Sequence, residues 1–333
     1  MEVYDVTIVG GGPVGLFGAF YAGLRGMKTK IIEALPQLGG QPMAMYPEKY
    51  IFDVGGHQAV LAKDLVAELI KQATQFNPTV VLGEEVEELQ REGDVWKLST
   101  AKGVHYSKTV VITAGMGAFS PKKLPLENLE KYENGHGVEY AVVKLDDYRG
   151  KRVLVVGGGD SAVDFANMLE PVAAQVTIIH RRDRFRAHEA SVEKMQQSSV
   201  VVKTPFEVKE LHGEERLEAV TVFNNKTKEE ETIPVDACVF ALGFTPDLSK
   251  IERWGLELDN DAIVIKNFKM ETNLPGVFAA GDIATYDGKI KLIATGFGEV
   301  ANAVNHAVTL VDPAARYDPG HSSSRKDLQP IVG

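Results

Sequence analysis

The stretch that decides the fold is Tyr4-Asp-Val-Thr-Ile-Val-Gly10-Gly-Gly-Pro-Val-Gly15. A β-branched run leads into three successive glycines, and the apolar-rich segment 16–26 that follows predicts a helix. In the fingerprint G-x-G-x-x-G, the first glycine makes the turn, the second admits a pyrophosphate and the third packs the helix on the strand. Gly10, Gly12 and Gly15 occupy these positions. Segment 28–33 predicts a second strand ending at Glu33, where an acid accepts from a ribose hydroxyl, so the sequence predicts a nucleotide-binding βαβ unit.

Length and composition limit the class of protein. The 333 residues predict two domains, and the net charge of −10 argues against nucleic acid or anionic membrane surfaces as partners. The single cysteine, Cys238, excludes an internal disulfide, a dithiol relay and a multi-thiolate metal site, so we expect no metal. Residues 1–5 carry no basic leader, which predicts a cytoplasmic location. Segment 6–24 is uncharged, but its six glycines and Pro13 argue against a membrane span.

A second nucleotide motif lies in the middle of the chain, in Lys151-Arg-Val-Leu-Val-Val-Gly157-Gly-Gly159-Asp-Ser-Ala162. Its second strand, 176–180, ends in a run of arginines where the first unit has an acid. Arginines supply forked, permanently charged donors to a 2′-phosphate, which predicts NADPH over NADH. The sequence does not determine which way the Arg184 side chain points. The residues predicted to bind NADP(H) are Gly157, Gly159, Asp160, Ser161, Ala162, His180, Arg181, Arg182 and Arg186.

Other segments resemble the thioredoxin-reductase-like flavoproteins. Leu38-Gly-Gly-Gln41 resembles the segment that runs beside the flavin in that family, and Asn273-Leu-Pro-Gly-Val-Phe-Ala-Ala-Gly-Asp282 resembles its second FAD motif. The resemblance implies bound FAD and an α/β fold of two Rossmann-like nucleotide-binding domains, with the NADPH domain inserted into a split FAD domain. The implied domains are 1–116 with 248–333 for FAD, including a C-terminal tail 311–333, and 117–247 for NADPH.

The predicted reaction follows from the absence of a redox-active Cys-x-x-Cys motif. Thioredoxin reductases carry Cys-x-x-Cys after a Gly-Val-x-Tyr string, whereas this chain has Gly137-Val-Glu-Tyr140 followed by Ala141-Val-Val-Lys144. Without a dithiol, the flavin must pass electrons directly to a carrier. The chain as a whole resembles the ferredoxin-NADP reductases of the thioredoxin-reductase-like type, which implies a homodimer that exchanges electrons with ferredoxin. The strings that carry this resemblance are Gly10-Gly-Gly-Pro-Val-Gly-Leu-Phe, Gly39-Gly-Gln, Tyr46-Pro-Glu-Lys-Tyr, Gly159-Asp-Ser-Ala, His180-Arg-Arg-Asp-x-Phe-Arg-Ala-His188 and His321-Ser-Ser-Ser.

The family resemblance also implies FAD contacts. These are Gly10, Gly12, Gly15, Glu33, Gln41, Tyr46, Val86, Phe119, Asp282, His321 and Ser323. Tyr46 and His321 are expected to stack on the two faces of the flavin, with the tail covering the flavin of its own or of a partner subunit. No catalytic side chain is expected, because the flavin carries the chemistry.

Several alternatives stay open at the level of sequence. An NADPH oxidase or diaphorase that reduces oxygen, quinones or dyes would use the same cofactors, and the carrier could be ferredoxin, flavodoxin or rubredoxin. The direction of electron flow is undecided. The insert 117–247 holds 17 basic and 22 acidic residues, so an acidic carrier requires a local basic patch. The candidates are Lys122-Lys123, Lys151-Arg152 and Arg325-Lys326.

Overall fold

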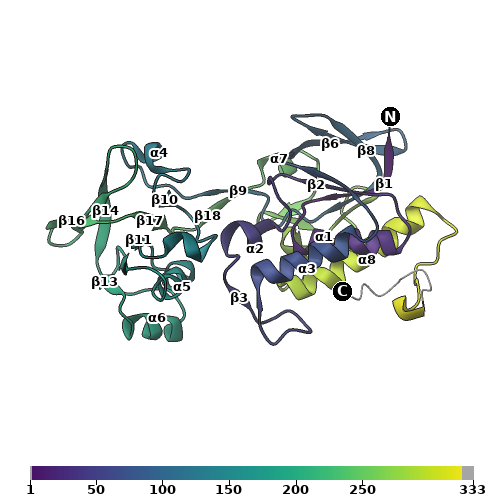
Figure 1. The fold of residues 1–333 in the computed structure, drawn as a ribbon. Helices are drawn as coiled ribbons and strands as arrows, with labels where there is room; N and C mark the ends of the chain where they lie inside the picture. Colours follow the sequence, from purple (N-terminus) through teal and green to yellow (C-terminus); the bar gives the residue numbers. More distant parts are fainter. Residues whose placement is uncertain (1, 325–333) are drawn as a thin grey trace. The chain divides into compact units, whose positions relative to one another are not determined.

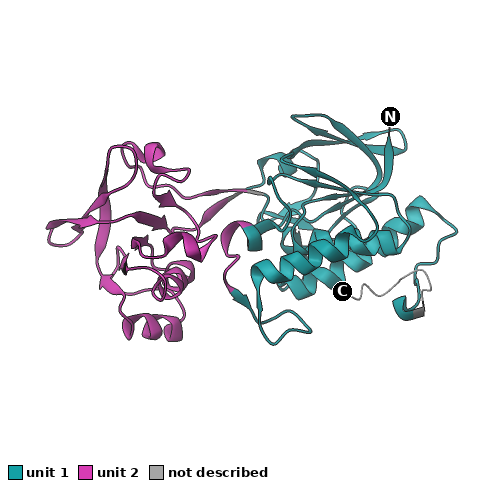
Figure 2. Ribbon diagram, viewed as in Figure 1, with its two compact units in different colours: residues 1–43, 50–118, 246–333 teal, residues 44–49, 119–245 magenta. Residues whose placement is uncertain are grey.

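The computed structural model describes residues 2–324, which form two compact units. Unit 1 comprises residues 1–43, 50–118 and 246–333, and unit 2 comprises residues 44–49 and 119–245 (Figure 2). The α/β fold class is confirmed. Segment 44–49, expected in the first domain, groups with unit 2 because Lys49 Nζ pairs with Asp164 Oδ2 at 2.7 Å and lies over the Phe165 ring.

Unit 1 is built on a seven-stranded sheet that carries the first glycine loop. Its strands run in the order β5 (Thr79–Leu82), β2 (Thr29–Glu33), β1 (Val3–Val9), β8 (Val104–Ile112), β7 (Val95–Thr100) and β6 (Val86–Glu92), with β21 (Val277–Ala279) also paired to β8. The pairings among β5, β2, β1, β8 and β21 are parallel, whereas β6, β7 and β8 form an antiparallel meander. Every residue of β2 is buried, as expected for a central parallel strand.

Three helices of unit 1 pack together beside this sheet. Helix α1 (Pro13–Leu24) lies between α3 (Ala62–Thr74) and α8 (Ile293–Val311) (Figure 1). A Cβ on Gly18 would lie 2.6 Å from Cγ2 of Val300, so the glycine permits the close approach of α1 and α8. The smaller elements of unit 1 are α2 (Gly40–Met45), which reaches into unit 2, β3 (Tyr50–Ile51), β4 (Val60–Leu61), α7 (Ser249–Glu252), β19 (Leu258–Asp259), β20 (Ala262–Val264), β22 (Ala284–Thr285) and the 3₁₀ turns Gly281–Ile283 and Ser322–Ser324.

Unit 2 has its own parallel sheet and core. The five strands are β10 (Val138–Glu139), β17 (Ala237–Phe240), β11 (Arg152–Val156), β12 (Gln175–Ile179) and β13 (Val201–Lys203), in that order. Helices α5 (Asp160–Leu169) and α6 (Glu189–Gln196) pack on each other, and both contribute to a core that β11 and β12 share. A separate antiparallel sheet consists of β14 (Phe206–His212), β15 (Ala219–Asn224) and β16 (Glu230–Pro234). The remaining elements are α4 (Leu129–Tyr132) and the 3₁₀ turn Leu145–Tyr148. The paired strands β9 (Ala118–Pro121) and β18 (Phe244–Asp247) each have residues in both units.

Within residues 2–324, no helix has the length and apolar character needed to cross a membrane.

Candidate functional site

The first glycine loop joins β1 to α1, and its glycines Gly10, Gly12 and Gly15 differ in the space around them. Gly10 has φ of +108°, and a Cβ there would lie 2.6 Å from the carbonyl oxygen of Thr113. A Cβ on Gly15 would lie only 1.9 Å from the carbonyl oxygen of Gly10, so glycine is required where the helix meets the strand. At Gly12 a Cβ would meet only the Cα of Gly40, at 3.8 Å. The loop is therefore tight at its first and third glycines and open at its second.

Glu33 ends β2 directly beneath this loop. Its Oε2 accepts a hydrogen bond from the backbone N–H of Gly11 at 2.6 Å, and its Oε1 accepts one from Leu35 at 2.8 Å. Burial raises the pKa of the Glu33 carboxyl, although the backbone N–H groups act in the opposite direction. Sequence reasoning assigned Glu33 to a ribose and missed this second role, which is to hold the glycine loop.

The Gly281-Asp282 turn follows β21 and lies beside the first turn of α1. A Cβ on Gly281 would be 3.2 Å from Cγ2 of Val14, and the Gly281 N–H donates to Oε2 of Glu299 at 2.8 Å. The side chain of Asp282 is half-buried and makes no hydrogen bond or ion pair with another described residue. The structure thus brings the glycine loop, Glu33 and an unengaged Asp282 carboxylate to one end of the unit 1 sheet.

Glu299 on α8 is a site residue that sequence reasoning missed. Its carboxylate also accepts from the hydroxyl of Tyr286 at 2.5 Å and pairs with Lys289, and the Lys289 and Glu299 side chains are each only 5% exposed. The signal in the sequence is helical spacing, because the apolar face of 293–311 continues through position 299 and places an acid among buried residues.

The other predicted FAD contacts fall in both units. Gln41 lies on α2, with its Nε2 3.1 Å from where a Cβ on Gly115 would be, and Val86 begins β6 as part of the core. Tyr46 and Phe119 belong to unit 2, where the Phe119 ring meets Phe244 edge-on at 5.5 Å between centroids. All four stay predictions as flavin contacts.

Residues 316 and 317 of the C-terminal tail pack against the ends of α1 and α8. Arg25, at the C-terminus of α1, donates from Nη1 to the carbonyl oxygen of Tyr317 at 3.0 Å, and the ring of Tyr317 stacks on His306 at 4.3 Å. The 12 residues of α1 span about 18 Å at about 1.5 Å per residue, so this contact lies far from the glycine loop. His321 and Ser323 are exposed, and their contact with a flavin stays a prediction.

The second glycine loop joins β11 to α5 and repeats the geometry of the first. Gly157 has φ of +153°, and a Cβ there would lie 2.4 Å from the carbonyl oxygen of Ala241 and 2.9 Å from Cβ of Ala162. A Cβ on Gly158 would clash with the ring of His180 at 2.3 Å, and one on Gly159 would meet nothing within 4 Å. The open position again precedes a helix N-terminus, where backbone N–H groups favour an anion.

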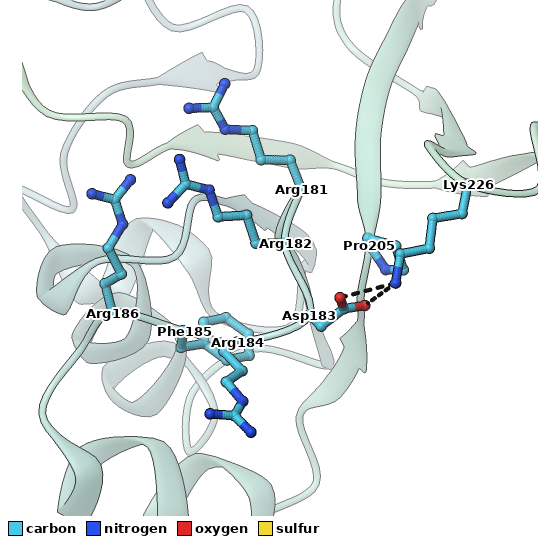
Figure 3. A pocket seen from close by; sticks show the side chains of 8 residues that line it. All are labelled: Arg181, Arg182, Asp183, Arg184, Phe185, Arg186, Pro205 and Lys226. Carbon is cyan, nitrogen blue, oxygen red and sulfur yellow. Dashed lines mark hydrogen bonds and ion pairs between the residues drawn. The ribbon is translucent and has the colours of Figure 1, made fainter.

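A hollow of about 550 Å³ lies next to this loop (Figure 3). Its lining residues are Arg181, Arg182, Asp183, Arg184, Phe185, Arg186, Pro205 and Lys226. The guanidinium groups of Arg181, Arg182 and Arg186 point to the same side of the loop, whereas Arg184 points away from them (Figure 3). None of these guanidinium groups has a hydrogen bond or ion pair with a residue in the described part of the chain. The arginine cluster is therefore positively charged and unneutralised.

His180 and Asp160 flank the arginines. The His180 ring is buried and stacks on Phe185 at 5.4 Å, its Nε2 has no partner among the described residues, and burial and Arg182 lower its pKa. Asp160 Oδ1 accepts from the backbone N–H of His188 at 2.9 Å, so this carboxylate holds the end of the segment that carries the four arginines. Ser161 is exposed beside it.

Two of the candidate docking residues, Lys123 and Arg152, are engaged in ion pairs within the protein. Lys123 forms an ion pair with Glu133 at 2.6 Å, and Arg152 forms a bidentate ion pair with Asp236. Arg325-Lys326 lies outside the described residues. Among residues 2–324 no group of His, Cys, Asp and Glu side chains could hold a metal ion.

Comparisons with known proteins give a consistent result. Residues 4–307 match the model of the family described as pyridine nucleotide-disulphide oxidoreductase. A ferredoxin-NADP reductase of Halalkalibacterium halodurans is 55% identical over 97% of this chain and 98% of that protein, and one of Geobacillus kaustophilus is 56% identical over 97% of each. Among solved structures, thioredoxin reductase of Lactococcus lactis is 28% identical with a TM-score of 0.74, covering 92% of this chain and 99% of that one. Thioredoxin reductase of T. acidophilum is 25% identical with a TM-score of 0.75, covering 93% and 99%.

Proposed function

Because this chain belongs to the pyridine nucleotide-disulphide oxidoreductase family and, within it, to the ferredoxin-NADP reductases, we propose that it exchanges electrons between NADP(H) and ferredoxin through bound FAD. FAD, when bound, exchanges a hydride with the nicotinamide and electrons with the carrier. The observation that carries the proposal is the high identity to relatives named for this activity, in a chain that has Ala141-Val-Val-Lys144 in place of a redox dithiol.

Unit 1 contains residues suited to hold FAD. Gly12 leaves its backbone uncovered at the uncapped N-terminus of α1, which suits the pyrophosphate. Glu33 fixes the loop and offers a carboxylate to the ribose. The Asp282 carboxylate, which has no partner among the described residues, can accept hydroxyl hydrogen bonds from the ribityl chain. Gly10, Gly15, Gln41 and Val86 complete the proposed contacts in this unit.

Unit 2 contains residues suited to hold NADP(H). The backbone at Gly159 and the N-terminus of α5 would receive the pyrophosphate, and Gly157 and Ala162 allow that loop to pack tightly on the helix. A 2′-phosphate carries a charge of about −1.5 to −2 near neutral pH, and the guanidinium groups of Arg181, Arg182 and Arg186 would neutralise it. His180, Asp160 and Ser161 would line the same site, and His180 has a buried ring nitrogen still without a partner.

The proposal includes two aromatic covers for the flavin ring. Tyr46 and His321 would each present a planar ring to one face, which excludes water and limits what can stack there. Phe119 and Ser323 are proposed as further contacts. Whether His321 serves its own or a partner subunit's flavin decides whether the site is complete in one chain.

We further propose a cytoplasmic homodimer. The dimer rests on the family resemblance, and a chain with a single cysteine, which cannot form an internal disulfide, suits a reducing compartment. The net charge of −10 supports proteins and small molecules, rather than nucleic acid or membrane surfaces, as partners. Light scattering after gel filtration gives the oligomeric state directly.

The experiment that tests the proposal is anaerobic turnover of NADPH with purified ferredoxin, flavodoxin and rubredoxin, compared with oxygen, quinones and dyes. We expect kcat/KM for ferredoxin to exceed the values for oxygen and quinones. An oxidase or diaphorase, which the names of the relatives do not favour, would show the reverse order. Boiled carrier and FAD-free protein serve as controls, since neither should support turnover.

A further inference from the structure

The arginine loop, defined here as residues 181–187, is fixed at both ends by the rest of unit 2. At its start, the carbonyl oxygen of His180 accepts from the N–H of Phe206 at 2.9 Å. At its end, the N–H of Arg186 donates to the carbonyl oxygen of Gly158 at 2.7 Å. The loop therefore closes back onto the second glycine loop, and the course of its middle part decides where the guanidinium groups lie.

The middle of the arginine loop is held by the turn between β15 and β16. Asn225 Nδ2 donates to the carbonyl oxygen of Arg181 at 2.6 Å, and the N–H of Asn225 donates to the carbonyl oxygen of Pro205 at 3.0 Å. Lys226 Nζ reaches both carboxylate oxygens of Asp183, at 2.8 and 2.9 Å (Figure 3). Neighbouring residues of one turn thus hold both the backbone and the acid of the loop.

The contact of Lys226 with Asp183 changes the charge of the arginine loop. Asp183 is the acid within a loop that carries four arginines, and an unpaired carboxylate there would bond a guanidinium and repel an incoming phosphate. Lys226 Nζ contacts both oxygens of this carboxylate, and this hydrogen bonding lowers the pKa of Asp183. Because Lys226 neutralises Asp183, the arginines stay available for an anion.

We propose that Asn225 and Lys226 are positioning residues that set the preference for the phosphorylated dinucleotide, Asn225 by fixing the backbone of Arg181 and Lys226 by sequestering Asp183. This inference rests on the NADP(H) activity proposed above. Asn225 does not line the hollow, whereas Lys226 does and is proposed to act there through Asp183. The effect should therefore be seen in binding of the 2′-phosphate and not in the chemical step.

The test uses the FAD-loaded enzyme and two adenosine ligands that differ only in the 2′-phosphate, namely adenosine 2′,5′-bisphosphate and AMP. Calorimetry should show that Asn225→Ala and Lys226→Met each weaken binding of the bisphosphate by roughly two- to fivefold. AMP binding should change by less than about twofold. In turnover, the KM for NADPH should rise in the same proportion while kcat stays constant.

Two variants at the same turn serve as matched controls. Thr227→Ala removes a hydroxyl whose contacts stay within the turn. Lys228→Met removes the same charge as Lys226→Met from a side chain that donates to the carbonyl oxygen of Asn225 and lies over the Phe223 ring. Both should bind the bisphosphate like the unmodified enzyme. Adding Asp183→Asn to Lys226→Met should restore binding, because it removes the carboxylate that Lys226 neutralises.

The possible failures are distinguishable. If the unmodified enzyme binds bisphosphate and AMP equally well, the proposed NADP(H) preference is wrong. If it discriminates between them but Asn225→Ala and Lys226→Met discriminate equally well, the positioning role is wrong. A Lys226→Met defect that Asp183→Asn does not repair, or that Lys228→Met reproduces, overturns the sequestering role. Equal thermal midpoints show that all variants are folded.

Discussion

The carboxylate of Glu33 is hydrogen-bonded at 2.6 Å to the backbone N–H of Gly11, the glycine at the centre of the first glycine loop. In the second loop the ring of His180 occupies the equivalent place, where a Cβ on Gly158 would lie 2.3 Å from it. Glu33, the last residue of β2, therefore hydrogen-bonds to the first loop, and the ring of His180, the residue after β12, lies against the second. These contacts fix each loop before any cofactor arrives.

The raised pKa of Glu33 predicts a specific pH dependence of stability. The folded protein holds this proton more tightly than the unfolded chain, so the contribution of Glu33 to the free energy of unfolding is larger at low pH and is lost as the pH rises through the folded pKa. The unfolding free energy of the FAD-free protein minus that of Glu33→Gln should thus decrease as the pH rises from below 4.5, the ordinary pKa of Glu, through the raised pKa of Glu33 in the folded protein. Urea denaturation measures this difference, with the exposed Glu68→Gln as control. An increase over this range would show that the hydrogen bonds outweigh burial.

Asp282 should contribute to retention of FAD. We expect the purified protein to be yellow, with about one FAD per chain, and Asp282→Ala to weaken FAD binding at least about tenfold, because a hydrogen bond to a charged group contributes roughly 1.5 to 3 kcal/mol. Fluorescence titration of stripped protein with FAD gives the dissociation constants. Asp287→Ala, a charge removal in the exposed segment a few residues later, is the control. Equal affinity of all three proteins would contradict the assignment.

The arginines should discriminate between NADPH and NADH. Replacing Arg181 and Arg182 together by Ala should lower kcat/KM for NADPH at least about tenfold while leaving that for NADH within about twofold, since only NADPH carries the 2′-phosphate. Steady-state kinetics with both cofactors measure the effect. Arg184→Ala provides the matched control, because its guanidinium points away from the other three (Figure 3). A loss with Arg184→Ala as large as that of the double variant would refute this division of roles.

Cys238 should have no part in electron transfer. It lies fully buried within β17, and burial raises the pKa of its thiol, which keeps it protonated and unreactive. Cys238→Ala should therefore leave reduction of ferredoxin and of dyes nearly unchanged while lowering stability by roughly 1 kcal/mol through lost packing. Turnover and thermal unfolding are to be measured on the same preparation. A folded, FAD-bound variant without activity would overturn the direct transfer of electrons.

Removing the tail tests the role of His321. Deletion of residues 312–333 should retain FAD, because the glycine loop and Asp282 are untouched, but should change the flavin absorption spectrum and the rate of the nicotinamide half-reaction. Stopped-flow absorbance measures both. His321→Ala in the full chain should reproduce the spectral change. If spectrum and rates match those of the full-length protein, His321 does not cover a flavin.

The sequence alone determined the two loops and the fold class. Gly10 and Gly157 need positive φ, and Gly15 and Ala162 need a small side chain against the preceding strand. These requirements involve residues close together in the chain, so the spacing of the glycines in the sequence predicts them. Two such strand-loop-helix units, together with the family motifs around them, predicted the α/β fold class because few chain topologies contain both units.

Only the tertiary structure decided which distant groups meet. The contact of Asn225 with Arg181 joins residues 44 positions apart, and the contact of Gly281 with Glu299 depends on how α8 returns along the sheet. The grouping of 44–49 with unit 2 depends on Lys49 finding an acid on α5. Such pairings leave no local pattern, because a hydrogen bond or ion pair constrains only the two groups that form it, and the course of the whole chain selects the partner.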